Sequence, residues 1–234
     1  MRTPRRNGSF RPARATLLAA TALALLVPFG AGAATFVVND LGDAHDAAPG
    51  AGGCATALAV CTLRAAIEEA NASAGADTIS FSVAGAIAPL TALPALTGIG
   101  GATIDGTTAP GYASTPVIEL NGTGAGPGVD GLVITGGSTT VLGLAINRFG
   151  GSGISIYQSN SNRIDSCFIG TDLTGTIDRG NTSTGIGVYD GDDNVIGDAA
   201  IGRRNLISGN GSSGIAIYGA SARTIVRGNF IGVN

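Results

Sequence analysis

The sequence predicts an all-β fold in which short strands stack as the coils of a single-stranded parallel β-helix. The first observation is a Gly-Ile-x-Ile/Val-Tyr unit that begins at Gly153, Gly185 and Gly214, with a weaker copy at Gly131. The second is the composition, with 39 glycines, no tryptophan and only 12% charged residues in 234. Glycine at this frequency indicates a repeat protein when the sequence is periodic, and disorder when it is not.

Each unit carries further apolar positions at recurring places. A second apolar residue follows the first by ten positions: the pairs are Leu132–Leu142, Ile154–Ile164, Ile186–Ile196 and Ile215–Ile225. Strands this short bury a face only if each coil rests on the next, at about 4.8 Å. We therefore expect the first members of the pairs to form one interior column. Asparagines that recur at the corners, such as Asn205 and Asn229, should form amide ladders.

Less regular coils are expected upstream of these units. Alternating segments lie at Asp77–Val83, Ala102–Gly106 and Pro116–Leu120, which brings the total to about six coils. A β-sandwich of short strands is the alternative, but sandwiches do not repeat one unit at a fixed internal spacing.

A short helix should cover the N-terminal end of the stack, because an open sheet edge invites aggregation. Thr62 is a suitable N-cap for a helix over Leu63–Ala70 that ends near Asn71. Apolar residues at i, i+3, i+4 and i+7 form one stripe on it. On this pattern Arg64, Glu68 and Glu69 should largely face water.

The first 33 residues have the three parts of a secretory signal peptide. A basic region with five arginines precedes an apolar run, and Ala31 and Ala33 provide a small-residue cleavage site. A retained membrane anchor is the alternative, and the pair Arg5-Arg6 lacks the apolar residues that follow a twin-arginine signal. The domain plan is then a signal over residues 1–33, a cap region over 34–76 and the β-helix over 77–234. We expect a secreted or cell-surface protein without membrane insertion after cleavage.

Charge excludes two classes of partner. All 13 basic residues are arginines, five of them before the cut, whereas all 16 acidic residues follow it. The cleaved chain therefore carries about −8, which suits neither nucleic acid nor an anionic membrane surface. Divalent cations remain compatible with it.

The C-terminal coil has no polar cap in the sequence. The chain stops at Asn229-Phe230-Ile231 and three further residues, whereas the equivalent Phe168-Ile169-Gly170 continues. Solenoids need a capped end. The sequence therefore predicts a fragment of a longer protein, a partner, or end-to-end self-association.

Two parts of the chain resemble known families. The string CTLRAAIEEAN, Cys61 to Asn71, resembles the signature of the CSLREA (CSLREAI) domain of secreted bacterial proteins, and the match extends over about Thr35–Ala72. Thr62 and Ala65 depart from the Ser and Glu of the name. The rest resembles right-handed parallel β-helix repeat proteins, which implies a right-handed coil. That group includes lyases, hydrolases, epimerases and adhesins, so the resemblance does not imply one activity.

The cysteines suggest one disulfide. Cys54 and Cys61 lie close together in an exported chain, which favours a small disulfide loop that fixes the approach to the helix. Two free thiols are the alternative, and a metal site has little support because His45 is the only histidine. Cys167 takes the position of Asn205 and Asn229, where we expect a buried, inert thiol.

Acidic residues offer few candidates for chemistry. Asp190, Asp192 and Asp193 form the densest cluster, which is either a calcium site or ordinary corner chemistry. Asp43 and Asp46, with His45, pose the same choice near Cys54. A glycosidase-like site needs carboxylates on neighbouring coils, and the sequence shows no clear pair. No catalytic residue and no obligatory cofactor are predicted.

Three tyrosines should form a row. Tyr157, Tyr189 and Tyr218 end the same strand in successive units, so they align on an outer face if the coils stack in register. Such a row is either a sugar-binding strip or a shield over a corner. We expect a non-enzymatic protein that presents a stiff face to polysaccharide or a surface partner. The alternatives are a polysaccharide lyase, hydrolase or epimerase, and a structural module of a longer surface protein.

Overall fold

The computed structural model describes Met1 and residues 32–98, 100–200 and 202–232. Nearly all of the predicted signal peptide lies outside these residues. The described residues from Gly32 onward belong to one compact unit, which is the subject below.

Three parallel sheets make up most of this unit, so the predicted parallel, strand-rich architecture is confirmed. Within the described residues, the seven-stranded sheet contains β1 (Thr35–Val38), β2 (Asp77–Phe81), β4 (Ala102–Asp105), β7 (Thr140–Leu142), β10 (Arg163–Asp165), β13 (Val195–Ile196) and β16 (Ile225–Val226). The six-stranded sheet contains β3 (Gly85–Ile87), β5 (Ile118–Asn121), β8 (Leu144–Asn147), β11 (Phe168–Ile169), β14 (Leu206–Ile207) and β17 (Phe230–Ile231). The four-stranded sheet contains β6 (Leu132–Ile134), β9 (Ile154–Tyr157), β12 (Ile186–Tyr189) and β15 (Ile215–Tyr218).

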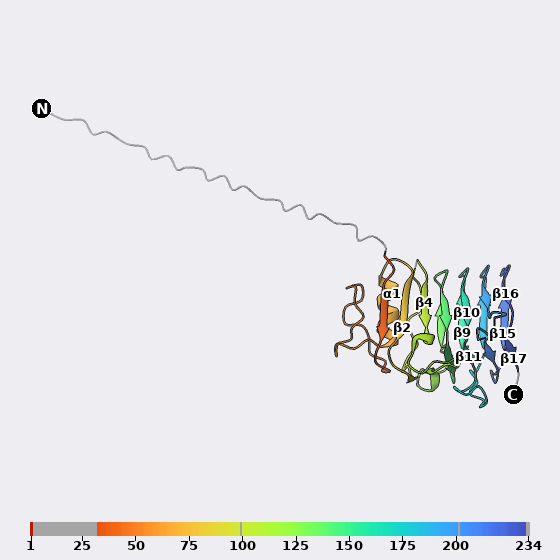
Figure 1. Cartoon of the computed structure of the whole chain (residues 1–234). Coiled ribbons are helices and arrows are strands. Elements are labelled where there is room, and N and C mark those ends of the chain that lie inside the picture. Colours follow the sequence, from red (N-terminus) through yellow and green to blue (C-terminus); the bar gives the residue numbers. More distant parts are fainter. Residues whose placement is uncertain (2–31, 99, 201, 233–234) are drawn as a thin grey trace. The chain divides into compact units, whose positions relative to one another are not determined.

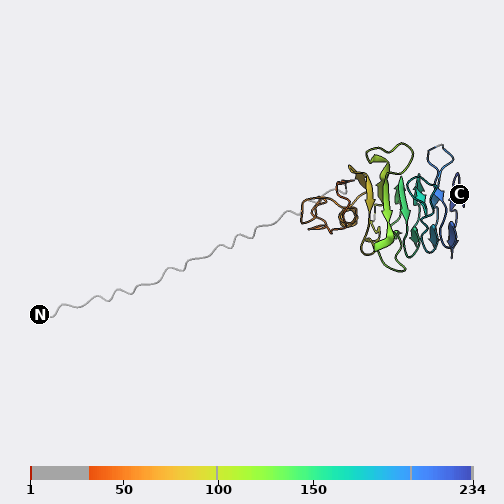
Figure 2. The same ribbon diagram turned by 90° about the horizontal axis from the view of Figure 1, so that it is seen from below.

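The chain visits the sheets in a fixed rotation. From β7 to β17 it passes from the seven-stranded to the six-stranded to the four-stranded sheet and then begins again. Figures 1 and 2 show the strands side by side in the order of their colours, from orange to blue. The three predicted upstream segments correspond to β2, β4 and β5. The first strand, β1, comes from the segment predicted as a cap and pairs with β2, and β3 was not predicted.

The predicted interior column is confirmed. Leu132 pairs with Ile154, Ile154 with Ile186, and Ile186 with Ile215. The first three are at most 1% exposed, whereas Ile215 on the last described coil is partly exposed. Isoleucine suits this place because β-branched side chains pack well on a pleated surface.

The ten-residue spacing of the sequence does not carry over to the strand register in two of the four copies. The register pairs Ile164 with Val141 and Ile196 with Val226, not with Leu142 and Ile225. Val141 is fully buried. The corner before β7 is one residue shorter than the one before β10, and the corner before β16 is one residue longer. A shift of one residue exchanges the two faces of a strand.

Asparagine ladders join the corners, as expected. The Asn162 Nδ2 donates to Asn194 Oδ1 at 2.8 Å, and Asn205 Nδ2 donates to Asn229 Oδ1 at 3.0 Å. A third ladder links Asn181 to Asn210 at 2.9 Å. These amides form hydrogen bonds with buried polar groups at the corners, which the strand pairing does not supply with partners.

One α-helix is present in the described residues, α1 (Leu63–Ala72), two residues longer than predicted. Thr62 is its N-cap and accepts from the Ala65 N–H at 3.1 Å, as expected. The helix packs against β1 and β2. The prediction that Arg64, Glu68 and Glu69 face water is wrong: Arg64 is 3% exposed, Glu69 is fully buried, and Glu68 is partly buried.

Two 3₁₀ turns complete the regular elements, η1 (Gly106–Thr108) and η2 (Gly122–Gly124), and each is capped by the preceding Asp105 or Asn121 side chain. No helix in the described part of the chain is long and apolar enough to cross a bilayer.

Candidate functional site

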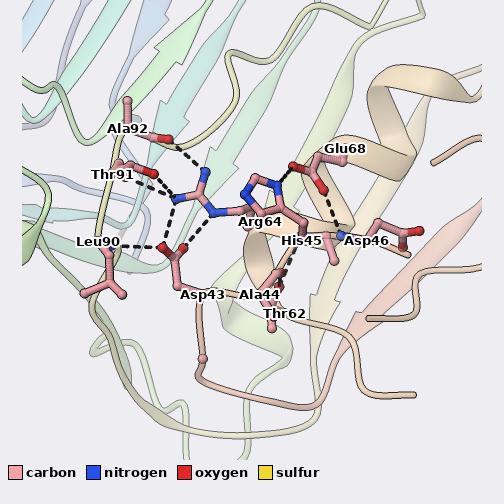
Figure 3. A network of polar contacts seen from close by, with 12 residues as sticks. Asp43, Ala44, His45, Asp46, Thr62, Arg64, Glu68, Leu90, Thr91 and Ala92 are labelled. Atoms are coloured by element: carbon pink, nitrogen blue, oxygen red, sulfur yellow. Dashed lines mark hydrogen bonds and ion pairs between the residues drawn. The ribbon is translucent and has the colours of Figure 1, made fainter. Parts of the chain in front are cut away.

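Arg64, a buried charged residue of α1, forms hydrogen bonds to the loops around the helix (Figure 3). The Arg64 guanidinium donates to both Asp43 carboxylate oxygens, at 2.9 and 3.0 Å. It also donates to the Ala92 and Thr91 carbonyls at 2.8 and 3.1 Å. The planar fork of arginine suits such a set of fixed acceptors. This cluster is saturated by its own contacts and therefore serves structure.

The two glutamates of α1 bind the loop before the helix. Glu69 accepts from the Gly50 and Gly52 N–H groups at 2.6 and 2.5 Å. Glu68 lies 2.6 Å from the His45 ring and accepts from the Asp46 N–H at 2.8 Å (Figure 3). These partners lie about twenty residues away in sequence, so the helical pattern alone does not reveal them.

The predicted ion-site residues near Cys54 have other roles. Asp43 pairs with Arg64, and Asp46 accepts from the Ala48 and Ala55 N–H groups at 2.8 Å. In the described residues no three His, Cys, Asp or Glu side chains are grouped to hold a metal ion. The Cys54–Cys61 disulfide is present.

The three tyrosines form a stacked row, the tyrosine ladder, as the register requires. The ring centroids of Tyr157 and Tyr189 are 4.6 Å apart, and those of Tyr189 and Tyr218 are 5.0 Å apart. The rings lie nearly parallel, at 17° and 14°. Both faces of Tyr189 are therefore covered by its neighbours. Burial raises the pKa of Tyr189, and the two flanking tyrosines add to this.

Small residues make room for the ladder. A Cβ on Gly187 would lie 2.6 Å from Cε2 of Tyr189, so the ring rests directly on this glycine. Ser155 and Ala216 occupy the same register position in the neighbouring coils. The pattern Gly-Ile-small-Ile/Val-Tyr is thus a packing requirement.

The candidate calcium residues each bind the next coil. Asp190 accepts from the Ala220 N–H and Asp192 from the Ala222 N–H, both at 2.8 Å. Asp193 pairs with Arg223 at 2.6 Å. Hydrogen bonding from Arg223 lowers the pKa of Asp193.

A carboxylate pair on neighbouring coils does exist, although no clear pair was visible in the sequence. Arg163 donates from Nε to Asp165 at 2.5 Å and from a terminal nitrogen to Asp198. Asp165 is fully buried, and its second oxygen has no hydrogen-bond partner among the described residues. Burial raises the pKa of Asp165, whereas the Ala200 N–H and Arg163 lower that of Asp198.

Cys167 is buried and unpaired, as predicted. Burial raises the pKa of its thiol to about 12, so the thiolate that a nucleophile requires is not available near neutral pH. Its backbone N–H donates to Asn205 at 2.9 Å, which makes it the first step of an asparagine ladder.

An apolar groove lies along the outer face of the six-stranded sheet. It encloses about 660 Å³ and is lined by Ser114, Phe168, Gly202, Arg204, Leu206 and Phe230. We call it the outer groove. Phe168, Leu206 and Phe230 form its floor, since they are cross-strand neighbours. Ile169 and Ile207, which follow Phe168 and Leu206 in the sequence, are fully buried, so Phe168 and Leu206 point outward. The register with Leu206 places Phe230 on the same outer face.

Two inserted loops form the rim of the outer groove. Ser114 comes from the long corner between β4 and β5, and Gly202 and Arg204 come from the corner between β13 and β14. The Ser166 hydroxyl donates to the Gly202 carbonyl at 3.0 Å and holds the second loop. The sequence shows these apolar pairs but not which member faces outward. In the structure the second member is buried in two of the three pairs, Ile169 and Ile207, while Ile231 is exposed.

Arg204 lies over one ring of the floor. Its guanidinium carbon is 5.3 Å from the centroid of Phe230, a cation–π distance. Phe230 is 48% exposed. An exposed ring, a guanidinium and a hydroxyl in one groove are the groups that a polar ligand with apolar faces can use.

The chain matches no protein-family model, and no curated protein proved similar to it. The resemblance of Cys61–Asn71 to the CSLREA signature therefore stays a prediction from its residues.

Proposed function

We propose that this chain is an exported or cell-surface protein, a right-handed parallel β-helix of about six coils, that binds polysaccharide in the outer groove without catalysing a reaction. The fixed rotation through three parallel sheets and the continuous interior column support the β-helix. The CSLREA-like segment and the Cys54–Cys61 disulfide support export, because disulfides persist in oxidising compartments.

The single observation that carries the binding proposal is the exposed aromatic floor of a groove beside a cation. Sugars present apolar C–H faces and polar edges, and aromatic side chains bind the former. Phe230 offers an exposed ring, while Arg204 and Ser114 offer donors at the rim.

The tyrosine ladder supports sugar binding less well than the sequence suggested. Stacking covers both faces of Tyr189, so a sugar would find only ring edges and hydroxyls there. We assign the ladder primarily to the support of the four-stranded sheet.

A lyase, hydrolase or epimerase is the second candidate, favoured by the Asp165–Arg163–Asp198 cluster. Catalytic carboxylates must contact the substrate, and Asp165 is fully buried. Incubation with uronic-acid polymers tests this alternative: new reducing or unsaturated ends would replace the binding proposal by an enzymatic one.

Calcium at Asp190, Asp192 and Asp193 remains a separate candidate. A bound ion would raise the midpoint of thermal unfolding. An unchanged midpoint after calcium and then chelator would exclude it.

Two matched variants test the proposed site. Phe230 and Tyr218 are each 48% exposed on the same coil, on different sheets. Phe230→Ala should abolish binding to a polysaccharide panel by affinity electrophoresis, while Tyr218→Ala should retain it. The reverse result would move the site to the tyrosine ladder, and no binding by the parent chain would refute the proposal.

A further inference from the structure

The charge of the outer groove differs from that of the chain as a whole. The full sequence carries a formal net charge of −3. Among the described residues that line the groove none is acidic, and Arg204 is the only charged one. A local positive site within an acidic protein selects for negative charge on whatever enters it.

Within the described part of the chain, the guanidinium of Arg204 makes no ion pair. The arginines that form ion pairs among the described residues are Arg64, Arg148, Arg163 and Arg223. For Arg204 the described residues show only the contact with the Phe230 ring, and the side chain is exposed. The contact with the ring is not a hydrogen bond to an oxygen, so the five N–H donors of the guanidinium are available for an anionic oxygen.

The neighbouring arginine has a different environment. The charge of Arg203 acts on Asp165, whose pKa it lowers against the larger effect of burial. Arg203 does not line the groove, whereas Arg204 does. Of these two consecutive arginines, Arg203 acts on the charge of Asp165, and only Arg204 is available to a ligand in the outer groove.

From these observations we infer that the outer groove is specific for an acidic polysaccharide, whose carboxylate or sulfate group pairs with Arg204 while its apolar C–H groups contact the floor of Phe168, Leu206 and Phe230. This inference rests on the proposed binding function and names its ligand class. Planar, bidentate pairing with an anionic oxygen pair is the interaction for which arginine is best suited.

The test compares polymers that differ only in charge. Binding to polygalacturonate and to its fully methyl-esterified form is measured by calorimetry, as is binding to chondroitin sulfate and desulfated chondroitin. The parent chain should bind at least one charged polymer about tenfold more tightly than its charge-reduced partner, the range expected for one charge-assisted hydrogen bond. The two pairs tell carboxylate from sulfate recognition.

Three variants assign the preference to residues. Arg204→Gln should remove the preference for charge and its salt dependence while weak binding to the esterified polymer remains. Arg203→Gln is the matched control and should keep the preference. The Phe230→Ala variant should bind neither the charged polymer nor its charge-reduced partner.

The possible failures are distinguishable. Equal binding of charged and neutral polymers by the parent chain overturns the inference and leaves the proposed function in place. A preference that survives Arg204→Gln also overturns it. Binding to none of the four polymers overturns both the inference and the proposed function.

Discussion

At the scale of single residues, the buried pair Arg64–Asp43 shows how a charged residue of a short helix can fasten that helix to the loops around it. The guanidinium is 3% exposed and its acceptors come from two separate loops. The pattern of α1 suggested a solvated face, because periodicity identifies the apolar stripe but does not show which loops cover the rest. Asp43 and the carbonyls of Thr91 and Ala92 are brought in only by the fold.

Asp43→Asn should therefore destabilise the protein strongly. The substitution leaves a buried guanidinium without its counter-charge, which costs about 3–5 kcal/mol in comparable sites. Urea unfolding measures the loss. Asp193→Asn, which breaks the exposed pair with Arg223, is the control and should leave the midpoint nearly unchanged. Equal effects from both substitutions would contradict the structural role.

Asp165 and Asp198 should give opposite pH dependences. The raised pKa of Asp165 means that the folded state holds its proton more tightly, so its ionisation opposes folding as pH rises above the usual aspartate range. Relative to the parent chain, Asp165→Asn should thus gain stability as pH rises from about 3 to 7. The lowered pKa of Asp198 means that its ionised carboxylate stabilises the folded state above the usual aspartate range. This stabilisation is lost on acidification. Asp198→Asn should accordingly lose most at neutral pH. Parallel curves for the two variants would refute this assignment.

At the scale of elements, the four-stranded sheet depends on small residues beneath the tyrosine ladder. Gly187→Ala places a methyl group where Cε2 of Tyr189 lies 2.6 Å away. The ring must shift from its present position in the stack, with a loss of up to about 1 kcal/mol and a change in the near-ultraviolet circular dichroism of tyrosine. Gly53→Ala is the control, since a Cβ there meets nothing within 4 Å. An unchanged spectrum for Gly187→Ala would show that the ring tolerates the methyl group.

The register of β7 has its own test. Val141 is buried in line with Ile164, and Leu142 is partly exposed. Val141→Ser should cost about 2 kcal/mol, because it removes buried apolar area and adds a polar group to the core. Leu142→Ser should cost clearly less by the same denaturation measurement. A larger loss of stability from Leu142→Ser would show that Leu142, and not Val141, is aligned with Ile164 in the core.

At the scale of the whole molecule, repetition is what made the fold predictable. The column from Leu132 to Ile215 and the asparagine ladders follow from positions that recur from unit to unit. The corners before β7 and β16 break the recurrence by one residue, so their register could not be predicted.

Insertions explain what was missed at the candidate site. The Asp165–Asp198 pair depends on the long corner between β13 and β14, and the rim of the outer groove depends on this corner and on the one between β4 and β5. Ser114 and Gly202 lie far apart in the chain, and only stacking brings them to one groove. A pattern repeated along the sequence cannot show where two unique loops meet.

The pairing of each strand with its counterpart in the next unit has a mechanical consequence. Partners in the four-stranded sheet are 22 to 32 residues apart, and the bonds between them point along the stack. Tension applied between the two ends of the stack therefore acts on the hydrogen bonds of one coil at a time. Optical-tweezer traces should then show a series of low-force steps, each releasing about 7 to 11 nm of chain, in place of one abrupt rupture.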